Sequence, residues 1–485
     1  MATLIISGGT IVTMDESRRV IEDGAVVVEN DRIVKVGQRE EIERSYQAPQ
    51  VIDAKRHVVM PGLIDGHGHA GHGLTKNLGT YKHMLWGHTA DAIYAEGTTE
   101  NFWYVEGLLT TLERLKAGTT CGLTFFGGGT MVMRTDDAVY ADRHAEAVRK
   151  VGIREFLTVG PSLPPYPRKY TTWSGSRSKD RMVSFAEQIE TSEEIVKRWH
   201  LKDAGRSYVS MMFPVYNPVT TPLNSTEMIA LMNRVEEVND LTARYQLLLN
   251  QDGHSTGTAK FAHEKLGMLG PHAILSHSTG LTREEVEICA ETDSVIAHNP
   301  SSGAIYSDYC PVPEMLDAGV RVILGSDGTA PDMGYDMFRH MFQCGRLHRT
   351  YKHDSLFMPP GKILELATID AAAALGVEHE IGSLEEGKKA DIILVDMHQP
   401  HLYPPLLPVD RLVNYASGAD VDTVIIDGVV LVQDRRVLCV DVDEVLESAH
   451  EEQEALFERM PHLRDLLAVP EGFWGKSRYP QEKER

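Results

Sequence analysis

The chain has 485 residues, of which 42% are hydrophobic and 24% are charged, a globular composition that excludes a disordered chain. This length suits a large barrel domain accompanied by a smaller domain. The formal net charge of −22 makes the surface repel nucleic acid and anionic lipid, so neither is expected as a partner.

Short strands are predicted throughout the first 60 residues. Residues 3–14 and 24–37 are rich in β-branched side chains, and Asn30-Asp31 marks a turn between two such runs. Residues 51–60 add a further strand pair. None of these segments has the periodicity of a long helix.

From Pro61 onward, short apolar strands alternate with longer helical segments. Residues 108–126 are typical, because a helix ends at Gly118 and a buried strand follows. The same plan recurs in the ranges 192–213, 227–250, 263–277, 284–300 and 312–327. Apolar strands between amphipathic helices indicate a parallel sheet covered by helices. About seven or eight such units predict an α/β fold, a (β/α)8 TIM-like barrel over residues 61–386.

Strands return after Gly387, in residues 390–397 and 422–438. Both ends of the chain are therefore rich in β-structure and flank the barrel. The simplest interpretation is one small β-sandwich domain formed by residues 1–60 and 387–440. Residues 441–485 begin with a helical pattern and then become polar, which predicts a helical C-terminal extension.

The five cysteines are scattered and show no CxxC spacing. An odd number without a pattern indicates reduced thiols, which predicts a cytoplasmic protein. The N-terminal residues lack a basic segment followed by an apolar one, and no run of about 18 apolar residues occurs. Neither an export signal nor a membrane span is expected.

The first barrel strand ends in a histidine pair, within the segment Pro61-Gly-Leu-Ile-Asp-Gly-His-Gly-His69. Side chains two residues apart on a strand point the same way, so His67 and His69 can bind one ion. The intervening glycine lets the backbone approach closely. Such a pair alone is a weak signal, and His72 is interpreted as a loop histidine.

Two further strand ends offer side chains of the metal-ligand type. His277 ends one apolar run, and Asp327 ends another, where Gly328 follows. Each residue alone is as well explained as a hydrogen-bonded polar group at a strand end. Because the carboxyl ends of barrel strands meet at one face, three such strand ends together predict a metal site there.

The ordered motifs resemble those of the amidohydrolase superfamily. The matching segments are residues 61–69, 112–120, 275–287, 296–302, 324–328, 367–376 and 381–396. The subgroup with the greatest similarity contains the triazine hydrolases, guanine deaminase and cytosine-deaminase-like enzymes, and the resemblance covers residues 1–435. It implies a distorted barrel, a β-sandwich from both termini and a divalent metal that activates a water molecule.

The resemblance also assigns roles to individual residues. It implies that His67 and His69 bind the metal, and that His277 either binds the metal or orients the water. Asp327 matches an aspartate that binds the metal and handles the proton of the water. His298 matches the histidine of the seventh strand and is a further catalytic candidate, with Asn299 beside it.

The fifth strand departs from the pattern of the subgroup, where it often ends in His-x-x-Glu. Here Asn250 stands where the ligand histidine would be, so it is a candidate ligand, and Gly253 stands where the glutamate would be. Asp252 and His254 lie beside them as replacements. His254 is the candidate proton shuttle, because an imidazole with a pKa of about 6.5 both donates and accepts near neutral pH. The alternative is that His254 faces the surface of the loop.

These observations predict a metal-dependent amidohydrolase that uses a metal-activated water to cleave a non-peptide C–N bond of a small molecule. The bond would belong to an amide, a urea or carbamate, or a heterocyclic amine. One divalent transition metal is expected, with zinc as the first candidate and iron, cobalt or manganese as alternatives. A dechlorinating or thiocarbamate-cleaving hydrolase and a non-catalytic scaffold are the other hypotheses. The expected partners are the substrate and further copies of the chain in a homo-oligomer.

The segment of residues 86–104 is rich in aromatic side chains and follows the first barrel strand. It is interpreted as a wall of the substrate pocket, with a packed loop or an oligomer contact as alternatives.

Overall fold

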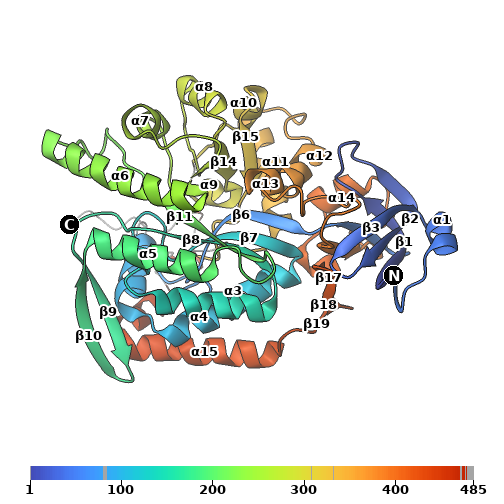
Figure 1. Cartoon of the computed structure of the whole chain (residues 1–485), viewed down its shortest axis with the longest axis horizontal. Helices are drawn as coiled ribbons and strands as arrows, with labels where there is room; N and C mark the ends of the chain where they lie inside the picture. The colour runs from blue at the N-terminus through green and yellow to red at the C-terminus, as the bar shows by residue number, and fades with distance from the viewer. Residues whose placement is uncertain are drawn as a thin grey trace.

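The computed structural model describes residues 2–79, 85–306, 308–330, 333–469, 472–475 and 477. Within these residues it contains an eight-stranded sheet, a nine-stranded sheet and a two-stranded hairpin. Figure 1 shows the eight-stranded sheet surrounded by helices at the centre, with the N-terminal strands to its right.

The eight parallel strands follow one another around the sheet in chain order. They are β6 (Leu63–His69), β7 (Thr119–Phe125), β8 (Arg154–Val159), β11 (Ser207–Met212), β12 (Leu249–Gln251), β13 (Ala273–Ser276), β14 (Val295–His298) and β15 (Arg321–Leu324). After β15, the Asp327 N–H donates to the His67 carbonyl at 2.9 Å, which joins the last strand to the first. The predicted (β/α)8 barrel is confirmed.

Helices cover the outside of the barrel. They are α3 (Glu100–Lys116), α4 (Ala138–Val151), α5 (Phe185–Trp199), α6 (Ser225–Tyr245), α7 (Thr258–Phe261) with η2 (Ala262–Leu266), α8 (Arg283–Glu291), α10 (Val312–Asp317), α11 (Met337–Lys352), α12 (Pro360–Leu366) and α13 (Ile369–Ala374). Local signals fix their ends. The Asn224 side chain accepts the N–H groups of Thr226 and Glu227 at the start of α6, and Gly152 takes a φ of 101° at the end of α4.

Insertions lie among the loops that follow the barrel strands. They are α2 (Leu85–Ala92) with η1 (Ile93–Gly97), the hairpin β9 (Arg168–Ser174) and β10 (Arg177–Val183), and α9 (Pro300–Tyr306). Since these loops surround the carboxyl ends of the strands, they shape the mouth of the barrel.

The nine-stranded sheet combines both ends of the chain. Its strands are β1 (Leu4–Val12), β2 (Val20–Glu29), β3 (Arg32–Gln38), β4 (Gln50–Asp53), β5 (His57–Pro61), β16 (Ile392–Asp396), β17 (Val421–Ile426), β18 (Val429–Gln433) and β19 (Arg436–Val437). Strand β5 runs antiparallel to β16 and joins the N-terminal strands to the C-terminal ones. The short helices α1 (Arg39–Ser45), α14 (Pro408–Asn414) and η3 (Gly418–Asp420) connect strands near this sheet.

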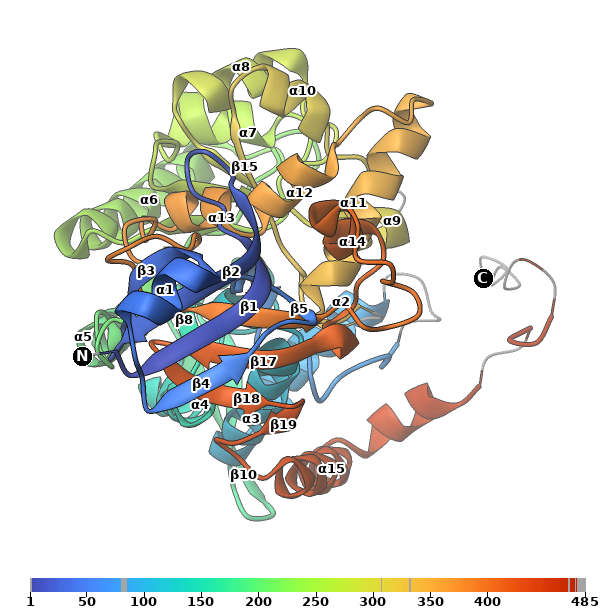
Figure 2. The same cartoon turned by 90° about the vertical axis from the view of Figure 1, so that its right-hand side faces the viewer.

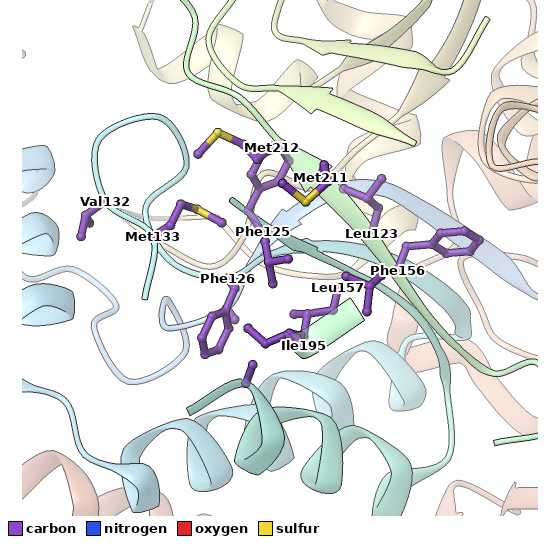
Figure 3. Packing of buried hydrophobic residues seen from close by; sticks show 14 of the residues in the cluster. Leu123, Phe125, Phe126, Val132, Met133, Phe156, Leu157, Ile195, Met211 and Met212 are labelled. Carbon is purple, nitrogen blue, oxygen red and sulfur yellow. The ribbon is translucent and has the colours of Figure 1, made fainter. Parts of the chain in front are cut away.

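The barrel core is filled by apolar side chains from strands and helices. Figure 3 shows Phe125, Leu157 and Met211 packed together in this cluster, and all three are at most 2% exposed. The paired methionines of β11, Met211 and Met212, are fully buried and belong to this core.

The C-terminal helix α15 (Val442–Arg459) packs along α3, and η4 (Pro461–Leu467) follows it toward the C-terminus (Figure 2). Leu463 of η4 is buried in the main apolar cluster. Leu456 and Phe457 of α15 are buried. None of the helices in the described ranges has the length and apolar character needed to cross a bilayer.

Candidate active site

The histidine pair of β6 lies at the carboxyl end of the barrel, beside Asp327. The Asp327 Oδ1 atom is 3.4 Å from His67 Nε2 and 3.1 Å from His69 Nε2. All three residues are buried, and one ligand atom from each lies within 4.8 Å of the others. Strands β6 and β15 therefore bring together the first three predicted ligands.

A second carboxylate, that of Asp252, reaches the same cluster from the loop after β12. Its Oδ1 atom lies 3.5 Å from His67 Nε2 and 3.2 Å from His277 Nε2, and its Oδ2 atom lies 3.7 Å from His69 Nε2. The Ser276 hydroxyl donates to Oδ1 at 2.6 Å and fixes the carboxylate. Asp252 thus contacts three imidazoles.

His277 completes the cluster and is its most exposed member, with 20% of its side chain exposed. The Asn299 amide nitrogen lies 3.5 Å from His277 Nε2. His277 and Asp327 adopt φ values of 63° and 65°, which residues other than glycine rarely take. Two strained residues that both face one cluster indicate that their orientation serves a function.

The cluster combines buried imidazoles with ionised carboxylates. Burial alone would raise the pKa of Asp327, but the positive charge of His277 and the neighbouring imidazoles of His67 and His69 hold that pKa well below its usual range. Burial would lower the pKa of His277, but Asp327 and Asp252 raise it to about 9. Two ionised carboxylates in a buried site attract a cation.

The donor set fits a divalent transition metal. His67 Nε2 is buried and makes no hydrogen bond with the described residues, so its lone pair is available to a cation. The His69 Nδ1–H donates to the Gly127 carbonyl at 2.9 Å, which fixes the ring and leaves Nε2 for the metal. Imidazole and carboxylate ligands suit zinc, iron, cobalt and manganese.

A cavity of about 120 Å³ opens beside the cluster. One wall is the face of α2 that carries Trp86, Gly87, Ala90 and Asp91, since residues at these intervals share a helix face. The rest of the described lining comes from His69, His72, Gly128, Met131, Asp252, Tyr306, Asp327, Ala330 and Met333.

Comparison with known proteins identifies the family. Residues 58–431 match the amidohydrolase family. The 5-methylthioadenosine/S-adenosylhomocysteine deaminase of Syntrophobacter fumaroxidans is 31% identical over 449 residues, which cover 92% of this chain and 96% of the relative. This chain belongs to the amidohydrolase family.

Two solved structures share the fold of this amidohydrolase. An adenosine deaminase from Xanthomonas campestris with bound zinc has a TM-score of 0.78 at 22% identity, over 94% of this chain and 99% of that one. The atrazine chlorohydrolase TrzN from Arthrobacter aurescens TC1, complexed with zinc, has a TM-score of 0.75 at 21% identity, over 93% of this chain and all (100%) of that one. The predicted resemblance to this family is confirmed.

The general function follows from the family and the site. The amidohydrolase uses a divalent metal and a metal-activated water to hydrolyse a carbon–nitrogen bond, other than a peptide bond, of a small molecule. This agrees with the activity predicted from the sequence.

Asn250, expected as a metal ligand, lies elsewhere in the amidohydrolase. It is on β12, and its amide donates to Ser210 Oγ at 2.9 Å. The carboxylate that reaches the cluster belongs to Asp252, because β12 ends at Gln251 and the following loop turns toward the barrel axis.

His254, expected as the proton shuttle, is buried rather than exposed, but its ring does not join the cluster. Its Nδ1 atom is 2.9 Å from Thr258 Oγ1, and its Nε2 atom is 3.3 Å from Gln251 Oε1. These contacts hold the loop after β12, which indicates a structural role for His254.

His298, the other catalytic candidate, ends β14, and its ring contacts His348 of α11, with 3.1 Å between the two Nε2 atoms. Its chain neighbour Asn299 contacts His277 instead. Neighbouring residues at a strand end face opposite ways, so only one of the two reaches the cluster.

His72 is part of the site although the sequence suggested only a loop histidine. Its ring stacks on that of His69 with 4.7 Å between centroids, and the Trp86 ring meets it edge-on at 5.4 Å. The spacing of His72 from the pair gave no signal, because the turn after β6 that returns it to the site is not periodic.

Asp65 stabilises the site through hydrogen bonds to two other segments of the barrel. Its carboxylate accepts hydrogen bonds from the backbone N–H of Ser326 at 2.9 Å and from Arg114 Nη2 at 2.9 Å. Since Asp65 is on β6 and Ser326 follows β15, this fully buried group fixes the histidine pair relative to Asp327.

Proposed function

We propose that the enzyme binds one zinc ion through His67, His69, Asp327 and Asp252, and hydrolyses an acyl-type C–N bond in a small uncharged amide, urea or carbamate. The observation that carries this proposal is the position of Asp252. Its carboxylate takes part in the cluster, whereas the residue after it, Gly253, has no side chain to supply the proton-shuttling group expected there.

A divalent cation held at this cluster lowers the pKa of a bound water toward about 7 and so supplies a nucleophile at neutral pH. The residues of the chain move the protons. The Asp327 carboxylate accepts the proton of the water, because it lies against the histidine pair. His277, whose side chain is 20% exposed, donates its Nε2 proton to the oxygen or the leaving nitrogen of the substrate.

The pocket supports an uncharged substrate. Its described lining includes no lysine or arginine that would bind an anion. The side chains of Trp86, Met131 and Ala330 give it an apolar surface, on which a flat or alkyl group packs. The carboxyl group of Asp91 is placed to accept an N–H group of the substrate.

Deamination of a heterocyclic amine is the second candidate, because the curated relative of 31% identity is a deaminase. Attack on an aromatic ring carbon interrupts the ring conjugation, and this attack is helped by an acid that protonates the ring nitrogen. A glycine at position 253 removes the group expected in that role. Hydrolysis of an acyl C–N bond needs only a proton on the departing nitrogen, which His277 supplies.

A substrate panel separates these candidates. The zinc-loaded enzyme is incubated with N-aryl and N-alkyl amides, ureas and carbamates, and with purine nucleosides related to 5-methylthioadenosine. Amine release from the first group, with ammonia release from the nucleosides at least about 100-fold slower in kcat/KM, supports the proposal. The reverse order establishes deamination, and activity that survives complete metal removal contradicts both.

The cytoplasmic location and the homo-oligomer are also proposals. The described cysteines are all free thiols, which supports a reducing compartment. The C-terminal segment carries Val469 at 67% and Trp474 at 90% exposure, which supports a contact with a further copy. Light scattering of the intact chain and of a chain that ends at residue 468 tests the oligomer.

A further inference from the structure

A second group of metal-ligand side chains lies between β14 and α11. His298 ends the strand, and Cys344 and His348 are four residues apart on the helix, so both face the same side. The three side chains are at most 1% exposed. One ligand atom from each lies within 4.8 Å of the others, and none of the three belongs to the group around Asp327.

The distance between the two imidazoles suits a shared cation. His298 Nε2 and His348 Nε2 face each other at 3.1 Å. In a tetrahedral zinc site with Zn–N bonds of about 2.0–2.1 Å, two ligand nitrogens lie about 3.3 Å apart. Without a cation, this pair requires one nitrogen to carry the proton and the other to accept it.

We propose that His298, His348 and Cys344 form a second metal site, distinct from the catalytic one, that takes a cation with affinity for sulfur and imidazole, of the zinc type. Two imidazoles and a thiolate are soft or borderline ligands and exclude magnesium and calcium, which prefer oxygen. With three protein ligands, the fourth position is left to water.

The surroundings are built for such a site. The His348 Nδ1 atom lies 3.4 Å from the Tyr309 hydroxyl, an outer partner of the kind that orients a metal-bound imidazole. Tyr309 stacks on Tyr351 with 3.5 Å between ring centroids and covers this side of the group. The buried Cys310 thiol lies nearby, and burial raises its pKa, with the proximity of Cys344 adding to the effect. The neighbourhood is therefore rich in sulfur.

The protons balance on binding. Burial raises the pKa of the Cys344 thiol to about 12, so the thiol is protonated until a cation binds and displaces its proton. The proton shared between the two Nε2 atoms moves to Nδ1 of its own ring, so each imidazole stays neutral and presents Nε2 to the cation. Each cation bound therefore releases one proton to solvent.

Cobalt titration of the metal-free, full-length protein tests the site. A thiolate bound to cobalt gives an intense near-ultraviolet charge-transfer band, and the catalytic cluster contains no cysteine. We expect this band to appear as the chain takes up two cobalt ions. Absence of the band at saturation overturns the proposal, and this result needs no variant.

Two variants and a matched control locate the ion. Cys344→Ser should abolish the thiolate band, and His348→Ala should reduce zinc by elemental analysis from about two ions per chain to about one. The matched control is Cys289→Ser, a buried thiol outside the group, which should keep both the band and the zinc. A band that survives Cys344→Ser contradicts the assignment. The test of the second site is independent of the proposed catalytic site, because Asp252→Asn should leave the thiolate band intact.

Discussion

The carboxylate of Asp252 lies within 3.7 Å of the Nε2 atoms of His67, His69 and His277, which makes it the second carboxylate of the proposed metal site. A second carboxylate ligand makes the metal site less positive and so a weaker Lewis acid than a site with one more imidazole. In the proposed mechanism His277, which lies 3.2 Å from Asp252, offsets this by supplying a proton.

Removal of the Asp252 charge should weaken both the metal site and the reaction. We predict that Asp252→Asn lowers kcat/KM by at least about 100-fold and weakens zinc binding by at least about tenfold. Metal competition assays and steady-state kinetics measure the two effects. Asn250→Ser, two residues away on the same segment, is the control and should keep its zinc. Equal zinc affinity in Asp252→Asn and the parent would remove Asp252 from the ligand set.

The buried carboxyl group of Asp91 lowers the stability of the folded protein, which indicates that it has a function. Burial raises its pKa from 3.8 to about 6, more than the charges of Arg168 and His88 lower it, and no described residue donates it a hydrogen bond. Because the folded state holds the proton more tightly, this group makes the protein less stable as pH rises from about 4 to about 6, and the loss persists at neutral pH.

The variant Asp91→Asn removes that buried charge. We predict that it raises the free energy of unfolding at pH 8 by about 1 kcal/mol, after allowance for partial exposure, with a smaller gain at pH 5. Thermal melts at the two pH values measure this difference. If Asp91 also binds an N–H group of the substrate, KM rises while the melting temperature rises, a combination that a purely structural residue would not give.

Individual site residues were less predictable than the strands that carry them. The histidine pair, His277 and Asp327 follow directly from apolar runs that end in polar residues. Asp252 was harder, because periodicity does not show that β12 ends at Gln251 and that the loop then turns inward. Neighbouring residues on a strand face opposite ways, so His298 and Asn299 were expected on opposite faces of β14. The sequence did not show which of the two faces the barrel axis.

At the scale of elements, the barrel strands were predictable because buried parallel strands are short, continuous and apolar. The insertions that form the pocket were not. Helix α2 presents Trp86 and Asp91 to the cavity, but it is only eight residues long (Leu85–Ala92), and its sequence also suits a packed loop. Its position depends on contacts with distant parts of the chain.

Helix α15 provides support for this region. The Arg459 guanidinium donates to the Gly97 carbonyl at 2.7 Å, at the end of the segment that follows α2. Asn101 of α3 donates to Glu452 at 2.6 Å. The C-terminal helix therefore holds the base of the pocket wall, although it is more than 340 residues away in sequence.

Shortening a buried side chain in the interface between α15 and the barrel should change substrate binding at the active site. We predict that Leu456→Ala, at a fully buried position, destabilises the protein by about 2–4 kcal/mol and raises KM through a looser α2. The control Leu446→Ala, on the same helix at 51% exposure, should change neither. Urea melts measure the stability, and steady-state kinetics measure KM. A large loss of stability with an unchanged KM would show that α15 does not support the pocket.

The whole molecule is held together by the sheet that joins both ends of the chain. Ile392 of β16 lies in the same buried cluster as Leu4 and Ile6 of β1. The Lys389 ammonium also donates to Asp31 at 2.5 Å. The sequence indicated strands at both ends but not their order, because pairing between segments more than 300 residues apart leaves no local pattern.

Because the core is shared, a destabilising substitution near one end of the chain should also destabilise the strands of the other end. Ile392→Ala removes a fully buried side chain and should cost about 2–4 kcal/mol. Hydrogen exchange in β1 and β2 should then accelerate by roughly 30-fold or more, because these strands lose the partner that buries them. Val429→Ala, in the same sheet at 55% exposure, is the control and should leave exchange unchanged. If Ile392→Ala lowers the melting temperature while β1 and β2 exchange at the parent rate, the two ends are stabilised separately, and the single-domain interpretation of residues 1–60 and 387–440 is wrong.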